Sequence, residues 1–211
     1  MKFRRKSAEP AESEAAAADA AEVEPVTGPY DVDDLPADDE VQRLDLGSLL
    51  IEPVADLEVR LQVEEGSEEV QAVVLAGAEG AIELRAFAAP RGGDLWSDVR
   101  PKIAADYAQR GGTATEREGR FGTELVCALT VTAPDGRTGT QPSRVIGVNG
   151  ERWMLRATLL GRPAAEIDAA GAWEDAIERI VVRRGTHAMP VGAELPLTLP
   201  PQDQLIHHTD A

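Results

Sequence analysis

The sequence has a single cysteine, Cys127, and aromatic residues make up only 4% of its 211 residues. One cysteine forms no internal disulfide and cannot build a cysteine-rich metal site. With so few aromatic rings, any core must be built from alanine, valine, leucine and isoleucine. Histidines number three, and the adjacent His207 and His208 have no evident third ligand beside them. We therefore predict no metal and no cofactor.

Positive charge is also scarce, because 38 Asp and Glu residues stand against 21 Lys and Arg residues, a formal net charge of −17. Phosphate contacts need a concentrated cationic face, so this balance argues against nucleic-acid binding by the folded domain. No apolar run approaches the roughly 18 to 20 residues of a membrane span, and no secretory signal is recognisable. We expect a cytoplasmic protein without a membrane span.

The acidity is uneven, since residues 1–45 carry 13 acidic and 5 basic side chains, a net charge of −8. The segment 7–25 contains almost nothing that could be buried, so burial cannot offset the entropy lost on ordering it. We predict a disordered acidic tail over 1–43 and a flexible C-terminal tail over 201–211. A basic cluster opens the chain and allows weak peripheral contact with an anionic membrane surface; it consists of Lys2, Arg4, Arg5 and Lys6.

Between residues 44 and 200 the apolar spacing predicts a single folded domain. Alternating or continuous apolar runs predict strands at 57–64, 70–75, 81–88, 124–131, 143–148 and 151–160. The first three are joined by short connections and form a meander. The pair Asn149-Gly150 favours a type I′ turn between the last two strands. A short extended segment over 194–200 contains two prolines, which exclude it from a central strand position.

Two segments have helical spacing. Val99, Ile103 and Tyr107 recur every four residues before a glycine pair that ends the helix. A proline inside this helix would cost about 3 kcal/mol, so we place its start at Asp98 as N-cap, with Pro101 in the first turn. A second helix is expected from residue 164 to about 180, with an apolar stripe consisting of Ile167, Ala170, Trp173, Ile177 and Ile180.

The order of these elements predicts an α+β fold. Its core is an antiparallel sheet of about six or seven strands, with two main helices packed on it and a disordered acidic N-terminal tail outside it. We find no catalytic arrangement: no serine in a nucleophile turn, no phosphate-binding glycine motif, and no distinguished pair of carboxylates. Cys127 alternates onto an apolar strand face, where cysteine behaves as a small apolar residue. We predict no catalytic residue, and the chain leans away from an enzyme.

Five residues are candidates for binding a partner or ligand: Phe87, Trp96, Arg152, Trp153 and Arg156. The two arginines share a predicted strand face with Met154, where they would receive an acidic partner segment or pair with the chain's own carboxylates. Trp96 either covers a pocket or closes the edge of the core.

Several motifs in one order resemble an uncharacterised actinobacterial family, domain of unknown function 3710. The motifs are Gly28-Pro29-Tyr30-Asp31, Arg43-Leu44-Asp45-Leu46-Gly47, Ala86-Phe87-Ala88-Ala89-Pro90 with Leu95-Trp96, Thr138-Gly139-Thr140-Gln141-Pro142, and Val145-Ile146-Gly147-Val148-Asn149-Gly150 with Arg152-Trp153. The resemblance covers about residues 28 to 200. It implies a cytoplasmic actinobacterial protein with an acidic N-terminal tail, and it supplies no activity, cofactor or catalytic residue.

The order of strands and helices also resembles the Mog1/PsbP-like fold, whose members are mostly binding and assembly factors, although architecture alone does not fix function. Our leading hypothesis is a non-enzymatic cytoplasmic protein-interaction or assembly module with a flexible acidic arm. The alternative is a small-ligand-binding or hydrolytic domain with a pocket near Phe87, Trp96 and Trp153.

Overall fold

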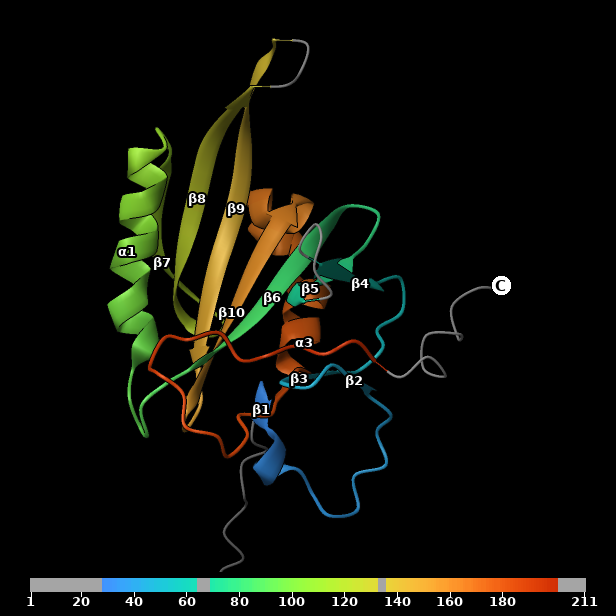
Figure 1. Ribbon diagram of the computed structural model, residues 1–211. Helices are drawn as coiled ribbons and strands as arrows, with labels where there is room; N and C mark the ends of the chain where they lie inside the picture. Colours follow the sequence, from blue (N-terminus) through green and yellow to red (C-terminus); the bar gives the residue numbers. More distant parts are fainter. Residues whose placement is uncertain (1–27, 64–68, 133–135, 201–211) are drawn as a thin grey trace, which may run out of the picture.

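The computed structural model describes residues 28–63, 69–132 and 136–200 (Figure 1). The predictions for the basic cluster Lys2, Arg4, Arg5 and Lys6, for the acidic segment up to residue 27 and for the tail after residue 200 lie outside the described residues. The described part contains two sheets and helices packed on them, which confirms the α+β fold class.

The main sheet has seven antiparallel strands in the order β4-β5-β6-β10-β9-β8-β7. Their bounds are β4 (Glu58–Val63), β5 (Val70–Ala76), β6 (Gly80–Ala88), β7 (Thr113–Gly119), β8 (Gly122–Thr132), β9 (Thr138–Asn149) and β10 (Trp153–Gly161). All six predicted strands are confirmed. The unpredicted β7 contains no large apolar residue, and an edge strand can form without one because a single neighbour supplies its hydrogen bonds.

A second, four-stranded sheet has the order β1-β11-β3-β2. Its strands are β1 (Tyr30–Asp31), β2 (Leu44–Asp45), β3 (Leu49–Ile51) and β11 (Val181–Val182). Strands of two or three residues are too short to carry a period, so the sequence did not predict them. Tyr30 pairs in parallel with Val181, and the indole Nε1 of Trp153 donates to Asp31 Oδ2 at 2.7 Å. Tyr30 and Asp31, which the sequence assigned to the tail, therefore lie against the domain, and η1 (Val32–Asp34) follows them.

Helix α1 spans Leu95–Gln109, so the predicted start at Asp98 is wrong and Pro101 lies inside the helix. Asp94 is the N-cap, and its Oδ1 accepts a hydrogen bond from the Ser97 backbone N at 3.0 Å. The first turn buries Leu95 and Trp96, and the indole Nε1 of Trp96 donates to the Thr123 carbonyl at 2.6 Å. This burial and this hydrogen bond offset the local cost of the proline.

The predicted long helix after Pro163 is also wrong, because three short elements replace it. They are α2 (Arg162–Ala165), η2 (Ile167–Ala169) and α3 (Gly171–Glu178). Glu166 has an extended backbone (φ −119°, ψ 104°), which separates α2 from η2. Trp173 and Ile177 of the predicted stripe are buried, but Ile167, next to the break, is 44% exposed.

The predicted type I′ turn at Asn149-Gly150 does not form, since neither residue has a positive φ. Met154 pairs with Asn149, so four residues rather than two separate the paired positions. The side chain of Asn149 is used elsewhere. Its Oδ1 accepts from the Trp96 backbone N at 3.1 Å, and its Nδ2 donates to Asp94 Oδ1 at 2.7 Å.

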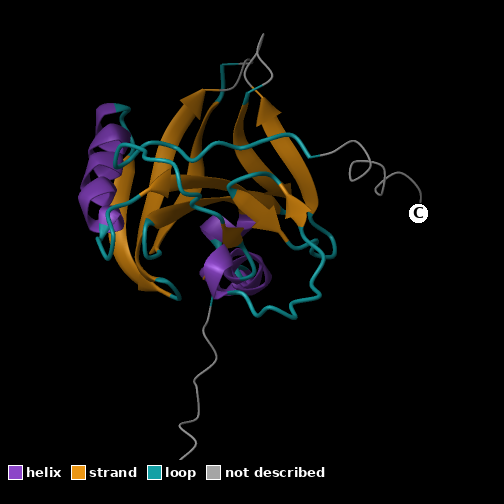
Figure 2. Ribbon diagram, turned by 60° about the horizontal axis from the view of Figure 1, so that its bottom comes forward, coloured by secondary structure: helices purple, strands orange, loops and turns teal. Residues whose placement is uncertain are grey.

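The main sheet is covered on both faces. One face packs on α3 and the second sheet through the predicted apolar side of β10, which includes the buried Trp153 and Leu155. The opposite face packs on α1 through Met154 and Cys127, and Figure 2 shows the two helical regions on different sides of the curved sheet. Helix α1 lies mainly over β7, β8 and β9, so the neighbouring β10 and β6 are partly uncovered on that face. None of the helices in the described part of the chain has the length and apolar character needed to cross a membrane.

Candidate functional site

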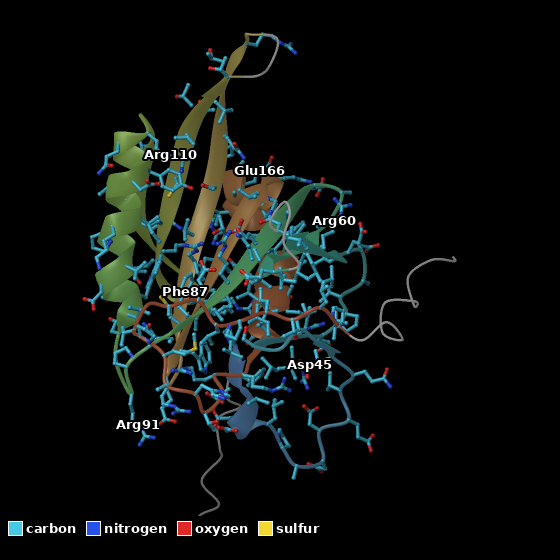
Figure 3. All side chains as sticks on the ribbon, in the orientation of Figure 1. Asp45, Arg60, Phe87, Arg91, Arg110 and Glu166 are labelled. Atoms are coloured by element: carbon cyan, nitrogen blue, oxygen red, sulfur yellow. The ribbon has the colours of Figure 1, made fainter. Side chains whose placement is uncertain are left out.

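A cleft of about 480 Å³ lies where α1 leaves the main sheet partly uncovered. One wall is a stripe of residues on α1 and its C-cap, three or four positions apart: Lys102, Ile103, Asp106, Tyr107 and the C-cap Arg110. The floor comes from three strands: Glu83 of β6, Val145 of β9, and Arg156 and Thr158 of β10. We call this site the α1 cleft. Figure 3 labels Arg110, at the end of α1, and Phe87, which lies on β6.

Arg156 at the cleft floor has a second arginine, Arg85, as its neighbour on the next strand. Arg156 of β10 is directly opposite Arg85 of β6 in the antiparallel register. Like charges in such a pair are destabilising, because their side chains start only about 5 Å apart. Glu83 Oε1 lies between the two, 3.0 Å from Arg85 Nε and 3.7 Å from Arg156 Nη2. Glu194, from the extended C-terminal segment, lies 3.1 Å from Arg85 Nη1. Arg85 thus has two carboxylate partners within hydrogen-bonding distance. The nearest carboxylate to Arg156 is that of Glu83, at 3.7 Å.

The electrostatics of the two arginines differ accordingly. Burial disfavours the charge of Arg85, but Glu83 and Glu194 outweigh it and raise the pKa of that guanidinium. Burial, followed by the charge of Arg85, lowers the pKa of Arg156 below its usual value. The side chain of Arg156 is 24% exposed, and its Cζ lies 5.2 Å from the centroid of the Phe87 ring. No described residue accepts a hydrogen bond from it.

The helical wall of the cleft combines fixed and free groups. Tyr107 is fixed, because its hydroxyl is 2.8 Å from the hydroxyl of the buried Ser143 on β9. Arg110 pairs with Asp106 at 3.3 Å, one helical turn away. Lys102 is exposed and has no ion-pair partner among the described residues. The lining therefore has three cations and two carboxylates, a local excess of positive charge on a chain of net charge −17.

The structure brings only two of the five predicted binding residues together, Phe87 and Arg156. Trp96 is 4% exposed beneath the start of α1, and Trp153 is 2% exposed on the opposite face of the sheet. Arg152 precedes β10 and donates from Nη2 to the Gly185 carbonyl at 3.3 Å. The predicted pocket near Phe87, Trp96 and Trp153 is therefore not a single pocket.

Sequence reasoning missed Arg85, Glu83 and the wall of α1 as site residues. A partial signal was present, because Glu83, Arg85 and Phe87 alternate on one face of their strand. The pairing of Arg85 with Arg156 depends on the strand register, and 70 residues of chain separate the two positions. No local pattern in the sequence predicts the register between β6 and β10.

A second charged cluster is buried on the other face of the sheet. Arg144 is fully buried, and its Nε and Nη2 donate to the two oxygens of the buried Glu124 at 3.1 and 2.8 Å. Its Nη2 also lies 2.7 Å from Glu174 of α3, and Arg117 donates to Glu124 at 3.0 Å. Every charge in this cluster has an ion-pair partner, and the pair Arg144–Glu174 links α3 to the sheet.

Two further reactive side chains, Cys127 and His187, lie outside the lining of the α1 cleft. Burial raises the pKa of the Cys127 thiol to about 11, against a weaker opposing hydrogen bond with Tyr107, so this cysteine is a poor nucleophile at neutral pH. His187 is exposed in a loop. No group of three or more His, Cys, Asp or Glu residues within 28–63, 69–132 and 136–200 is placed to hold a metal ion.

Comparison with known families gives one result. A family model described as "Protein of unknown function (DUF3710)" matches residues 28–205, which confirms the family resemblance predicted from the sequence motifs. No curated protein and no solved structure matches the chain. The similarity to the Mog1/PsbP-like fold thus stays a prediction.

Proposed function

This chain belongs to the DUF3710 family of proteins of unknown function, and from that premise we propose that it is a non-enzymatic protein-interaction module whose partner binds in the α1 cleft. The observation that carries the proposal is the charge of the cleft lining, because five of its nine residues have a charged side chain. Only Ile103 and Val145 among the lining residues are aliphatic.

This lining suits a protein segment better than a small organic ligand. Small-molecule pockets are mostly apolar, with a few polar groups that orient the ligand. Protein interfaces are about as polar as the rest of the surface, and they are enriched in tyrosine and arginine. The α1 cleft presents Tyr107, Arg110 and Arg156, and Tyr107 is already held in place by Ser143.

The charges also bear on the class of partner. A nucleic acid would meet the carboxylates of Glu83 and Asp106 in the cleft and a net charge of −17 over the chain, so the proposal does not include it. The proposed location is the cytoplasm, in keeping with the free thiol of Cys127. Fractionation of cells that express the full chain tests that location.

Affinity capture with matched variants tests the proposed function. The full chain and its variant Lys102→Glu with Arg110→Glu serve as baits in extract from the source cells. Both substituted side chains lie on the exposed wall of α1, so the fold should be retained. The matched control is Arg60→Glu with Arg91→Glu, which reverses two exposed arginines outside the cleft.

We expect the wild type and the control variant to capture the same specific proteins. The cleft variant should fail to capture them. The proposal is overturned if all three baits capture the same proteins. It is equally overturned if a metabolite raises the melting temperature of the wild type but not of the cleft variant, because the cleft would then be a small-ligand site.

A further inference from the structure

We propose that the segment bound in the α1 cleft is acidic and that one of its carboxylates forms a bidentate pair with Arg156. This inference rests on the proposed function, because it assigns a chemistry to the partner of the same cleft. It is carried by the donor groups of Arg156 and by their surroundings.

Arg156 has unused hydrogen-bonding capacity. A guanidinium has five N–H donors in a fixed planar arrangement. The one carboxylate oxygen near it, Glu83 Oε1, lies at 3.7 Å from Nη2, beyond the range of a hydrogen bond. The side chain is 24% exposed and its nitrogen atoms reach solvent, so a ligand in the cleft can contact these donors. A carboxylate with two oxygens matches two parallel N–H groups and supplies the missing acceptors.

Two like charges face each other across the two strands. Arg85 is opposite Arg156, and the two carboxylates beside them, Glu83 and Glu194, hydrogen-bond to Arg85. Arg156 has only Glu83 nearby, at 3.7 Å. The lining as a whole has three cations and two carboxylates, so a carboxylate of a partner would enter a site of net positive charge. In a half-buried site such a pair is screened less by salt than on an open surface.

The lining also bears on the type of anion. A phosphate group carries close to two negative charges, and it would meet Glu83 beside Arg156 and Asp106 on the α1 wall. A carboxylate carries one charge and suits this mixed lining better. Lys102, without an ion-pair partner among the residues described, lies on the same α1 wall and can receive a second acidic side chain of the same segment.

The experiment is a selection of peptides from a random displayed library, with the full chain as bait. Binding of the selected peptides is then measured by fluorescence anisotropy against the wild type, Arg156→Gln, Arg156→Lys and the control Arg60→Gln, which changes an exposed arginine outside the cleft. Circular dichroism and thermal unfolding establish that each variant is folded. Inorganic phosphate is tested as a competitor against chloride at equal ionic strength.

We expect Asp and Glu to be enriched in the selected peptides. Arg156→Gln should weaken their binding at least tenfold, and Arg156→Lys should lose less, because it keeps the charge but not the bidentate geometry. Replacing the anchoring Asp or Glu of the peptide by its amide should weaken wild-type binding equally. The same amide replacement should have little further effect on binding to the Arg156→Gln variant. This non-additivity would identify Arg156 and the carboxylate of the peptide as partners.

The alternative outcomes separate this inference from the proposed function. Peptides that depend on the cleft but show no enrichment of acidic residues overturn the acidic segment and leave the interaction module standing. Acidic peptides that bind Arg156→Gln as tightly as the wild type overturn the role of Arg156. Efficient displacement by inorganic phosphate overturns the choice of a carboxylate. A library that yields no cleft-dependent peptide contradicts the proposed function itself.

Discussion

Arg85 and Arg156 lie directly opposite each other on β6 and β10, and only Arg85 has close carboxylate partners on two sides. Two adjacent cations on neighbouring strands cost stability. A residue that destabilises the free protein at the floor of a cleft is typical of a binding site, because binding groups are retained for function rather than for stability. This relationship leads to the first prediction.

Replacing Arg156 with methionine should stabilise the free protein. The substitution removes a half-buried charge and its repulsion from Arg85, while the methionine side chain still packs on Phe87. We expect a gain of about 0.5–1 kcal/mol in the free energy of unfolding, or a rise of about 1–4 °C in melting temperature. Differential scanning calorimetry measures it, with Arg60→Met as the exposed control. A fall in melting temperature would mean that Arg156 has a structural role.

The same substitution at Arg144 should have the opposite effect. Arg144→Met leaves Glu124, which is 2% exposed, without its bidentate partner. Loss of one member of a buried ion pair costs about 3–5 kcal/mol. Urea unfolding should show this loss, and adding Glu124→Leu should recover part of it, because it removes a buried carboxylate that keeps only Arg117 as its partner. A loss below about 1 kcal/mol for Arg144→Met would contradict the role assigned to the buried cluster.

Asp94 should stabilise the start of α1 in a pH-dependent way. Hydrogen bonds from the hydroxyl and then the backbone N–H of Ser97 lower the pKa of this carboxyl, so the folded state favours its charged form. The stabilisation is complete above the unfolded pKa of about 3.9 and is lost as the pH falls through the lower folded value. Asp94→Ala should therefore cost about 1 kcal/mol at pH 7 and less at pH 3, measured by urea unfolding. An equal cost at both pH values would exclude the carboxylate as the cap.

Two glycines of β9 provide a matched test of packing beneath α1. A Cβ at Gly147 would overlap the Trp96 ring, whereas a Cβ at Gly139 on the same strand would meet nothing within 4 Å. Gly147→Ala should cost about 1–3 kcal/mol and change the near-ultraviolet circular dichroism of the tryptophans. Gly139→Ala should leave both nearly unchanged. Equal effects at the two positions would mean that Trp96 does not pack on Gly147 in solution.

The fold was predictable where one side of an element is buried over several residues. The alternation of Trp153, Leu155, Ala157 and Leu159 reports a buried strand face directly, and the structure buries all four. The start of α1 was not predictable, because the burial of Trp96 against distant strands decides it. Strands of two residues, such as β1 and β11, are formed by tertiary pairing and leave no period in the sequence.

The site was predictable only in part for the same reason. Phe87 and Arg156 were identified as candidates because of their residue types and their places on strands. Their juxtaposition with Arg85, and with Lys102 and Tyr107 across the cleft, follows from strand register and helix placement. Residue type and place on a strand can also mislead. Arg144 and Glu124 are charged strand residues as well, but they are buried and pair with each other.

The most direct test of the central claim is an NMR titration of the full chain, labelled with ¹⁵N at its arginine side chains, with an acidic peptide from the selection. The Nε–Hε signals are assigned from single Arg→Lys variants. We expect the signal of Arg156 to move on binding. The signal of Arg144, which is paired with Glu124 on the opposite face of the sheet, should stay in place. A peptide that binds without moving the Arg156 signal would contradict the central claim.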